Sequence, residues 1–327
     1  MSLYDRIPVV IPSYNPDEKL CATELVSMYS LKKYNPAAHI VLLTDGATGL
    51  TLKGRRENLL SYIDEHIVVE TPKDFIAIQK SRFLKTCMRH HIQGDCLYID
   101  NDTLITGDLS ELENIDVELG AVYDNHRNDW NEKHPFPMVV EYYHCMGFDK
   151  LPSYNITHHF NGGLMYSKDT ELSHKLYSKW HELWHEGSNR GFHSDQPSLW
   201  LANSELKNPI VAISGTYNCQ VPYDGSLKFL DEAKILHYFS SYKIFQGFFM
   251  QDKQILQHIK NEGIDSRIDN LIENAKKDFK KNIYVLKGKD LEIYNSPTVV
   301  LARKISRDFP WTNKLAKSLY SLFGHTI

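Results

Sequence analysis

The chain has 327 residues, of which 42% are hydrophobic and 24% charged, and a formal net charge of −4 at pH 7. These values are typical of an enzyme-sized globular protein and exclude a disordered or fibrous chain. The negative net charge gives no electrostatic basis for binding nucleic acid, so we expect no nucleic-acid partner. Five widely spaced cysteines without a Cys-x-x-Cys pair indicate reduced thiols. The first residues contain charges and prolines but no long apolar run, so we expect no signal peptide, no membrane span and a cytoplasmic location.

Strand-like and helix-like segments alternate in the N-terminal part, which is typical of a wound α/β domain. Parallel strands end at the same edge of a sheet, so the residues after them would face one crevice. Neither a Gly-x-Gly-x-x-Gly motif nor a Walker loop follows these strands, which argues against a dinucleotide oxidoreductase or a P-loop enzyme. The expected elements are a strand over 7–11, a helix over 20–33, strands over 39–43 and 67–69, a helix over 75–92 and a strand from residue 96.

Two carboxylates, Asp100 and Asp102, follow the apolar run of residues 96–99 and are separated by Asn101. Alternate side chains of a strand point to the same side, so both carboxylates can converge on one hard cation. An ion held by two carboxylates keeps positions open for phosphate oxygens, and the pattern therefore predicts Mg²⁺ or Mn²⁺ with a nucleotide diphosphate. The alternative is a solvated turn, which the same residue types favour.

Three local clusters further along the chain could also carry chemistry. They are two glycines beside an amide, an acid and an amide before a helix, and a histidine within an apolar strand. Each has a structural alternative: a β-bulge, a helix N-cap followed by proline, and a satisfied core histidine. The residues are Asn161, Gly162 and Gly163; Asp195 and Gln196, before a helix expected over 197–203; and His237, in a strand expected over 233–239 and followed by Lys243.

A second motif points to a different chemistry. His181, Glu182 and His185 match His-Glu-x-x-His, in which two histidines on one helical face bind Zn²⁺ and the glutamate acts as general base. The surrounding segment predicts an amphipathic helix with its leucines and tryptophans inward. Glu205 would be the third ligand, while Ser188 stands where metzincins have glycine. A zinc metallopeptidase is therefore an alternative function.

The order of the motifs resembles the glycogenin and lipooligosaccharide galactosyltransferase family, a family 8-like group of retaining, nucleotide-sugar-dependent glycosyltransferases. The resemblance implies the GT-A fold, with a mixed, mostly parallel α/β sheet flanked by helices. The segment after His237 departs from the family pattern, with Ser240 in place of glycine and Ile244-Phe245 in place of Pro-Trp. The residues that carry the resemblance are Arg82, Tyr98 to Thr103, Asn161 to Gly163, Asp195 with Gln196, and His237 with Lys243.

The resemblance also implies what the site residues do. Mn²⁺, or Mg²⁺, would be held by Asp100, Asp102 and His237. For retention of configuration, either Asp195 or Gln196 attacks the anomeric carbon, or the acceptor hydroxyl enters on the face that the leaving group vacates. We favour front-face transfer with Asp195 positioning the sugar. The catalytic residues would be Asp195 and Gln196, and the donor-binding residues Tyr14, stacked on uracil, with Asp45, Arg82, Asn101, Asn161, Gly162 and Lys243.

The implied function is transfer of a hexose from a UDP-sugar, UDP-galactose or UDP-glucose, to a saccharide or glycolipid acceptor in the synthesis of cell-surface polysaccharide or lipopolysaccharide. A non-catalytic sugar-nucleotide-binding module is a further alternative. We expect a GT-A catalytic domain over 1–250, with a nucleotide-sugar half over 1–105 and an acceptor half over 106–250.

A helical, basic extension is expected over 251–327, where basic and apolar residues recur at helical spacing. Such a tail can make peripheral contact with an anionic membrane, and the alternative is a helix docked on the catalytic domain with its lysines solvated. The basic residues are Arg303, Lys304, Arg307, Lys314 and Lys317, and the apolar ones Trp311, Leu315, Leu319, Leu322 and Phe323.

Overall fold

The chain forms two compact units, Met1–Phe279 and Lys280–Ile327. Tyr14 and Lys243, two of the predicted donor-binding residues, lie outside the described residues, so their roles stay predictions. The computed structural model describes residues 9–13, 21–128, 137–147, 158–240, 248–281, 288–309 and 311–322.

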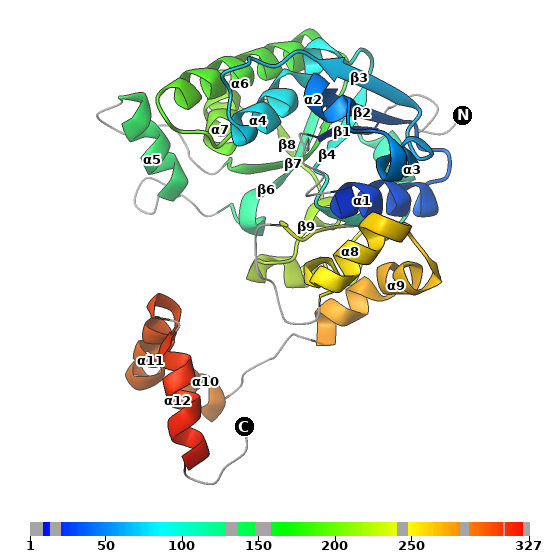
Figure 1. The fold of residues 1–327 in the computed structure, drawn as a ribbon. Coiled ribbons are helices and arrows are strands. Elements are labelled where there is room, and N and C mark those ends of the chain that lie inside the picture. The colour runs from blue at the N-terminus through cyan, green and yellow to red at the C-terminus, as the bar shows by residue number, and fades with distance from the viewer. Residues whose placement is uncertain are drawn as a thin grey trace. The chain divides into compact units, whose positions relative to one another are not determined.

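A mixed sheet forms the centre of the first unit (Figure 1). Among the described residues it has seven strands, in the order β3-β2-β1-β4-β7-β6-β8. Neighbouring strands pair in parallel except at β7, which runs antiparallel to β4 and to β6. The expected mixed, mostly parallel sheet is therefore confirmed. The strands are β1 Val9–Ser13, β2 Ile40–Asp45, β3 Glu65–Val69, β4 Cys96–Ile99, β6 Leu119–Tyr123, β7 Phe160–Ser167 and β8 Val211–Ala212.

Helices cover both faces of this sheet, which explains why its central strands are continuous apolar runs. On one face α4 and α7 both pack against α6, and α1 lies on the other face (Figure 1). All residues of β2 and β4 are buried as a result. The helices up to the second unit are α1 Cys21–Tyr34, α2 Gly46–Gly49, α3 Glu57–Leu60, α4 Ala77–Cys87, α5 Pro137–Met146, α6 Glu171–Asn189, α7 Gln196–Glu205, α8 Lys253–Glu262 and α9 Ser266–Lys281.

The elements expected in the N-terminal part are present, with ends that differ by a few residues. The helix expected over 75–92 is α4, continued by a 3-10 turn over Met88–His90. The short strand and helix expected near residues 67 and 197 are β3 and α7. Apolar periodicity thus located each element, whereas its ends depend on caps and turns that periodicity does not describe.

A second sheet lies at the carboxyl end of β4. As described, its strand order is β5-β10-β9. β10 runs antiparallel to β5, and this register places His237 opposite Thr103. The second sheet therefore brings a histidine from much later in the chain next to the two aspartates. Its strands are β5 Thr103–Ile105, β9 Cys219–Gln220 and β10 Ile235–His237.

The reversed direction of β7 brings its first residues to the carboxyl edge of its neighbours. The pairing of β6 with β7 shifts between Ala121 and Val122, so Gly162 and Gly163 lie in a β-bulge. The Asp100 N–H donates a hydrogen bond to the Gly163 carbonyl at 2.9 Å. The bulge that was one interpretation of the two glycines is present, and it lies directly beside the aspartates.

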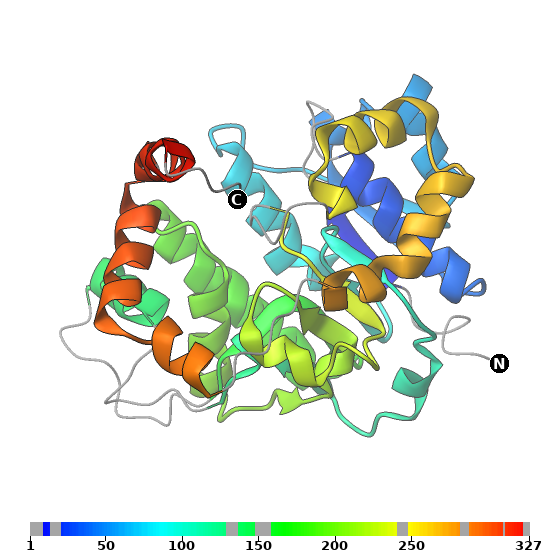
Figure 2. The same cartoon turned by 90° about the horizontal axis from the view of Figure 1, so that it is seen from below.

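The helices α8 and α9 bury their apolar sides in the first unit, and Figure 2 shows α8 beside α1. Tyr29 on α1 donates a hydrogen bond to Asp269 on α9, with 2.7 Å between Oη and Oδ1. Because these helices pack on α1, the two units divide at Phe279, later than the boundary expected near residue 250. The buried side chains are Ile259, Ile268, Ile272, Ala275 and Phe279.

The described part of the second unit is helical, as expected for the C-terminal extension. It consists of α10 Lys289–Tyr294, α11 Pro297–Asp308 and α12 Trp311–Leu322. Among the described helices of the chain, none combines the length and apolar character needed to cross a membrane.

A buried ion pair joins α1 to the segment that follows β2. Arg56 Nη2 lies 2.7 Å from Glu24 Oε2, and each side chain is 1% exposed. Ser13, at the end of β1, donates a hydrogen bond to the other Glu24 oxygen. A buried charge without a partner is costly, so this pair constrains how α1 packs against the end of β1.

Arg56→Met should lower the free energy of unfolding by about 3–5 kcal/mol, because it removes the guanidinium that compensates the buried charge of Glu24. The double variant Glu24→Met, Arg56→Met should recover most of this loss, since both charges are then absent. Urea denaturation followed by circular dichroism measures the two changes. Equal losses in the single and double variants would contradict this account of the pair.

Candidate active site

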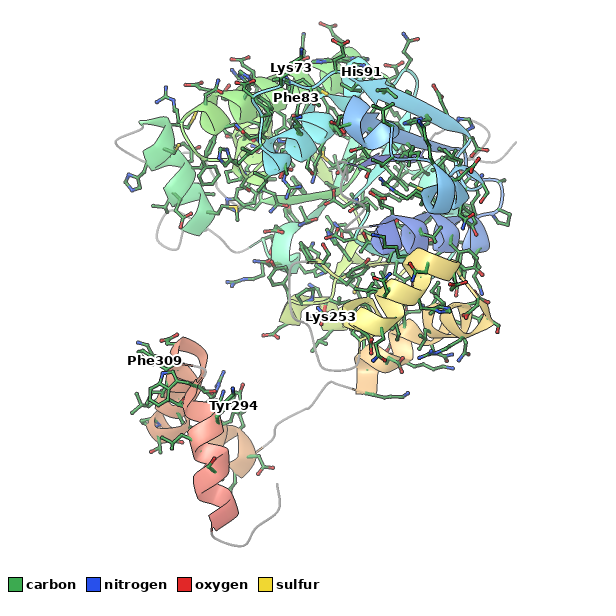
Figure 3. The ribbon with its side chains drawn as sticks, viewed as in Figure 1. Lys73, Phe83, His91, Lys253, Tyr294 and Phe309 are labelled. Carbon is green, nitrogen blue, oxygen red and sulfur yellow. The ribbon has the colours of Figure 1, made fainter. Side chains whose placement is uncertain are left out.

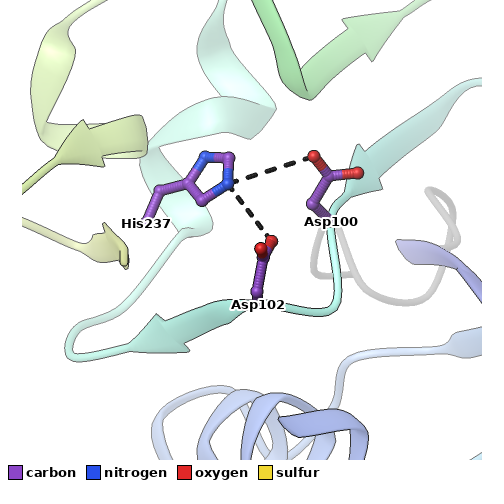
Figure 4. Close-up of side chains that lie close together, drawn as sticks. All are labelled: Asp100, Asp102 and His237. Carbon is purple, nitrogen blue, oxygen red and sulfur yellow. Dashed lines mark ion pairs between the residues drawn. The ribbon is translucent and has the colours of Figure 1, made fainter. Parts of the chain in front are cut away.

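Two carboxylates and one imidazole meet where β4 leads into the second sheet (Figure 4). His237 Nε2 lies 3.2 Å from Asp102 Oδ1 and 4.0 Å from Asp100 Oδ2. One ligand atom from each residue lies within 4.8 Å of the other two, and no second group of this kind occurs in the part of the chain that the structure describes. The fold thus brings together the three residues that the sequence suggested as metal ligands.

The lack of a side chain at Gly163 makes room for His237. A Cβ atom at Gly163 would lie 2.3 Å from His237 Cε1 and 2.7 Å from Nδ1, closer than non-bonded atoms can approach. Phe239 stacks on the imidazole, with 3.8 Å between the ring centroids. Packing therefore fixes the orientation of the ring, with Nε2 toward the aspartates.

Asp102 is held in its ionised form. Burial alone would raise its pKa, but the hydrogen bond and the charge of His237 and two bonds from Ser240 outweigh burial and hold the pKa well below its ordinary value. The Ser240 bonds run from its backbone N and its Oγ to Asp102 Oδ2, at 2.9 and 3.2 Å. Asp100 accepts a hydrogen bond from the Tyr98 hydroxyl. Neighbouring groups thus orient both carboxylates.

The donor set fits a divalent cation such as Mn²⁺ or Mg²⁺. Carboxylate oxygens with one imidazole nitrogen suit hard and borderline ions. The side chains of Asp100 and Asp102 are 22% and 20% exposed, so an ion can reach them from solvent. Three protein ligands leave coordination positions open for phosphate oxygens or water.

Asp195 is buried before α7 and is paired with two cations from α4. Arg82 Nε lies 2.9 Å from Asp195 Oδ1, and Lys85 Nζ lies 3.1 Å from Oδ2. Burial alone would raise the pKa of Asp195, but the charges of Lys85 and Arg82 hold that pKa below its ordinary value. Asp195 occupies the N-cap position of α7, yet its side chain makes no capping hydrogen bond. Its carboxylate therefore belongs to the ion-pair cluster and not to the helix end.

Lys85 is a site residue that the sequence analysis missed. Its side chain is 4% exposed, and Nζ lies 3.4 Å from an Asp100 oxygen as well as beside Asp195. It therefore connects Asp100, one of the candidate metal ligands, with Asp195. A signal was available, because Lys85 follows Arg82 by three positions and so shares its face of α4. That signal was weak, since a lysine in an amphipathic helix is usually solvated.

Buried polar groups connect the other predicted residues of this region. Asn161 Nδ2 lies 3.0 Å from Gln196 Oε1, and the same oxygen accepts a hydrogen bond from the Gly162 N–H at 3.0 Å. Asn161 also donates to Asp124, which the sequence analysis did not single out, at 2.8 Å. Burial raises the pKa of Asp124 although hydrogen bonds from Asn161 and Gln196 favour its charged form. Asn161, Gly162 and Gln196 thus form one cluster.

Asp45 and Asn101 are the two other predicted donor-binding residues that the structure describes. Asp45 is the N-cap of α2, where its Oδ1 accepts a hydrogen bond from the Thr48 N–H at 3.0 Å. It lies at the carboxyl end of β2, which β1 separates from β4. Asn101 lies partly exposed between the two aspartates. The donor-binding roles of Asp45 and Asn101 stay predictions.

The His-Glu-x-x-His segment has structural contacts within α6. His181 Nδ1 lies 2.8 Å from Thr86 Oγ1, and burial lowers the pKa of His181 to about 4. Its ring packs on Phe83, labelled on α4 in Figure 3. Glu205, the expected third ligand, pairs with Lys179 at 3.2 Å. Among the described residues no metal-ligating group includes these histidines, so the zinc interpretation gains no support.

The mixed sheet, with its carboxylate pair at the end of a central strand, has the architecture of the GT-A fold, and comparison with solved structures finds similar chains. Galactosyltransferase LgtC, in complex with donor and acceptor sugar analogs, is 14% identical with a TM-score of 0.50, over 81% of this chain and 100% of that chain. Glycosyltransferase GlyE of Streptococcus pneumoniae is 17% identical with a TM-score of 0.48, over 84% of this chain and 64% of that chain. Mouse xyloside xylosyltransferase 1, in its apo form, is 14% identical with a TM-score of 0.47, over 73% of this chain and 99% of that chain.

Residues 93–245 match the family model described as Glycosyl transferase family 8. The matched segment begins just before β4 and extends past His237, so it contains all three candidate metal ligands. Among curated proteins, none matches the chain. The matched segment is slightly less than half of the chain and is similar to family 8, in agreement with the resemblance seen in the sequence. The chain is a glycosyltransferase.

Lys85→Met should lower the free energy of unfolding at pH 7 by about 3 kcal/mol, because it removes one of the two cations beside the buried Asp195. The folded-state pKa of Asp195 is lowered, so its ion pairing stabilises the protein above the unfolded pKa of about 3.9. That contribution is lost as the pH falls through the folded-state pKa. The deficit of the variant should therefore shrink as the pH falls below about 4, which urea denaturation at a series of pH values can measure.

Lys179→Met is a matched control, because Lys179 pairs with Glu182 and Glu205 on the exposed side of α6. Exposed ion pairs contribute little, so this variant should lose less than about 1 kcal/mol. A Lys85→Met deficit that is as large at pH 3 as at pH 7 would refute the stated role of Asp195.

Proposed function

We propose that the protein is a retaining, metal-dependent glycosyltransferase that moves a hexose from a UDP-sugar to a saccharide acceptor. The observation that carries the proposal is the cluster of Asp100, Asp102 and His237 at the carboxyl end of β4. This edge is where open α/β sheets bind nucleotides. UDP-galactose and UDP-glucose are the donors that we propose, and the synthesis of cell-surface polysaccharide or lipopolysaccharide is the proposed setting.

Mn²⁺ or Mg²⁺ would be held by Asp100, Asp102 and His237, and when bound it would supply positive charge that stabilises the diphosphate leaving group. Neighbouring residues of the chain orient these ligands and keep Asp102 charged. Ser240 and Tyr98 orient the two carboxylates, and the lowered pKa of Asp102 keeps its carboxylate charged at neutral pH. Little reorganisation is then needed when a donor arrives, which favours catalysis.

Asp195 is proposed to position the donor sugar instead of attacking it. Both of its oxygens are engaged by cations, Oδ1 by Arg82 and Oδ2 by Lys85. A carboxylate whose charge is compensated on both oxygens is a weak nucleophile. Gln196 Oε1 already accepts two hydrogen bonds, and an amide oxygen is a poor nucleophile in any case. These contacts support front-face entry of the acceptor hydroxyl beside a fixed Asp195.

Calorimetry with UDP tests the donor site. We expect binding in the presence of Mn²⁺ and none in the presence of EDTA. Asp102→Ala should weaken the Mn²⁺-dependent binding by about 100-fold or more, because it removes a metal ligand. Hydrolysis of UDP-sugars by the wild-type protein would then identify the donor.

Asp108→Ala is the control for removal of a nearby carboxylate. Asp108 is exposed and accepts hydrogen bonds from Ser110. This variant should bind UDP as the wild type does. Wild-type protein that binds no UDP with Mn²⁺ would overturn the proposed function.

We also propose that the second unit contacts an anionic membrane surface, which suits a glycolipid acceptor. Its described helices expose large apolar side chains, with Trp311 64% and Phe309 54% exposed. Figure 3 shows Phe309 and Tyr294 at the surface of these helices. Arg303 and Lys304 are exposed on α11. Apolar and basic side chains in this combination are typical of helices that lie at a membrane interface.

Sedimentation with vesicles tests this contact. The chain should bind vesicles that contain phosphatidylserine and bind little to vesicles of phosphatidylcholine alone. Arg303→Glu with Lys304→Glu should reduce binding to the anionic vesicles by about tenfold or more, since each basic residue near such a surface contributes about 1 kcal/mol.

Lys73→Glu with Lys253→Glu changes the net charge equally at two exposed positions of the first unit, both labelled in Figure 3. This control should bind the anionic vesicles as the wild type does. An equal reduction in both double variants would show that net charge, and not the second unit, determines binding.

A further inference from the structure

A chain of three side-chain amides, of which Asn161 and Asn218 are buried and Gln196 is half-buried, leads from the neighbourhood of Asp195 to the candidate metal site. Gln196 Oε1 lies 3.0 Å from Asn161 Nδ2, and Asn161 Oδ1 lies 3.0 Å from Asn218 Nδ2. Asn218 Oδ1 in turn lies 3.0 Å from His237 Nδ1. Asn218 is fully buried, and Asn161 and His237 are each 2% exposed. Water therefore does not compete for the two bonds of Asn218.

The backbone of the β-bulge determines the direction of every bond in this chain. A backbone N–H can only donate, so the Asn161 atom that lies 2.9 Å from the Gly163 nitrogen must be the oxygen. The Asn218 atom that faces this oxygen must then be the amide nitrogen, Nδ2. This leaves Asn218 Oδ1 facing His237, and an amide oxygen can only accept. His237 Nδ1 must therefore carry a proton.

The Gly162 N–H fixes the other end of the chain by the same argument. It lies 3.0 Å from Gln196 Oε1, so this atom is the oxygen of the amide. The Asn161 nitrogen then donates to Gln196, in agreement with the orientation that Gly163 requires. Two adjacent backbone groups thus assign all three amides without contradiction.

The protonated Nδ1 has a consequence for metal binding. With Nδ1 protonated, Nε2 is the ring nitrogen that can bind a metal. In the metal-free protein Nε2 makes the hydrogen bond to Asp102 at 3.2 Å, and a bound ion would replace that contact. Histidine binds metals through an unprotonated ring nitrogen, and a hydrogen bond from the other nitrogen orients it. The amide chain therefore selects the tautomer that the metal site needs.

We propose that Asn218 is a positioning residue that fixes the tautomer of His237 and couples the metal site to the cluster of Asn161 and Gln196. It contributes from the end of a short 3-10 turn, Gly215–Asn218, that precedes β9. The inference rests on the proposed function, because it takes His237 as a metal ligand. Asn218 acts on the reaction only through its two neighbours. Through these bonds a shift of His237 would be transmitted to Asn161 and Gln196, and a shift of either amide would be transmitted back to His237.

The protonation of His237 can be observed directly by NMR in metal-free protein labelled with ¹⁵N in its histidines. We expect a protonated Nδ1 whose hydrogen exchanges slowly with water, and loss of this signal in His237→Gln identifies it. An unprotonated Nδ1 in the wild-type protein would overturn the inference. The measurement requires no metal, so it separates this inference from the proposed function, which fails if the wild type binds neither Mn²⁺ nor UDP.

Two substitutions separate the two links that Asn218 makes. Asn218→Leu removes both hydrogen bonds and should weaken binding of Mn²⁺ alone, followed by electron paramagnetic resonance, by about 10–100-fold. Asn218→Asp still accepts the bond from His237 but cannot donate to Asn161. Its Mn²⁺ affinity should equal or exceed that of the wild type, while kcat/KM for UDP-sugar hydrolysis should fall about tenfold or more. If Asn218 only stabilised the fold, Asn218→Asp would lower both the Mn²⁺ affinity and kcat/KM.

Asn203→Asp is the matched control, because Asn203 is also fully buried and its Oδ1 accepts a bond from the Ile210 N–H at 3.0 Å, outside the amide chain. It should leave Mn²⁺ affinity and kcat/KM unchanged. The inference is overturned if the two Asp variants behave alike, or if folded Asn218→Leu binds Mn²⁺ as the wild type does. If Asn218→Leu does not fold, the Asn218→Asp variant and the NMR measurement still test the role of Asn218.

Discussion

Compensation of negative charge is the constraint on which the rest of the site depends. Asp100, Asp102 and Asp195 gather where solvent screens little, and carboxylates at such distances repel one another. Lys85 contacts both Asp100 and Asp195, and Arg82 pairs with Asp195. His237 faces Asp102. The chain therefore holds its acidic residues in place with its own cations, and the site keeps its shape before any ion or donor binds.

The sheet and the aspartate pair could be predicted because both follow from local pattern. Apolar runs that end in polar residues mark strands of a wound sheet, and Asp100 and Asp102 directly follow one of them, β4. His237 was found only through the order of motifs, since a lone histidine in an apolar strand has no local signature. Lys85 and Asn218 were missed for a physical reason: their roles depend on which elements pack opposite them. A lysine on a helix and an asparagine in a turn look ordinary until those partners are known.

The helices α8 and α9 show that the composition of a segment does not reveal which of its residues are buried. The segment of α8 and α9 is polar in composition, and for this reason it was assigned to the extension. Its few isoleucines fall on one face, and Ile259, Ile268 and Ile272 are completely buried. Composition averages over both faces of a helix, whereas packing depends on one of them. Ser240 was noted as a departure from the family pattern, and its hydroxyl gives Asp102 a hydrogen bond that glycine could not provide.

The pairing of β10 with β5 joins segments that lie far apart in the chain, with His237 opposite Thr103. Closing so long a loop is entropically unfavourable until most of the domain has formed, so contacts of this kind appear late in folding. During synthesis, a chain that has not yet incorporated β10 carries both aspartates but lacks their histidine. A divalent ion held by all three residues, as proposed above, would bind only the finished domain and would stabilise it over every incomplete form. The ion that is proposed to bind the donor diphosphate would therefore also favour the completely folded domain over partly folded chains.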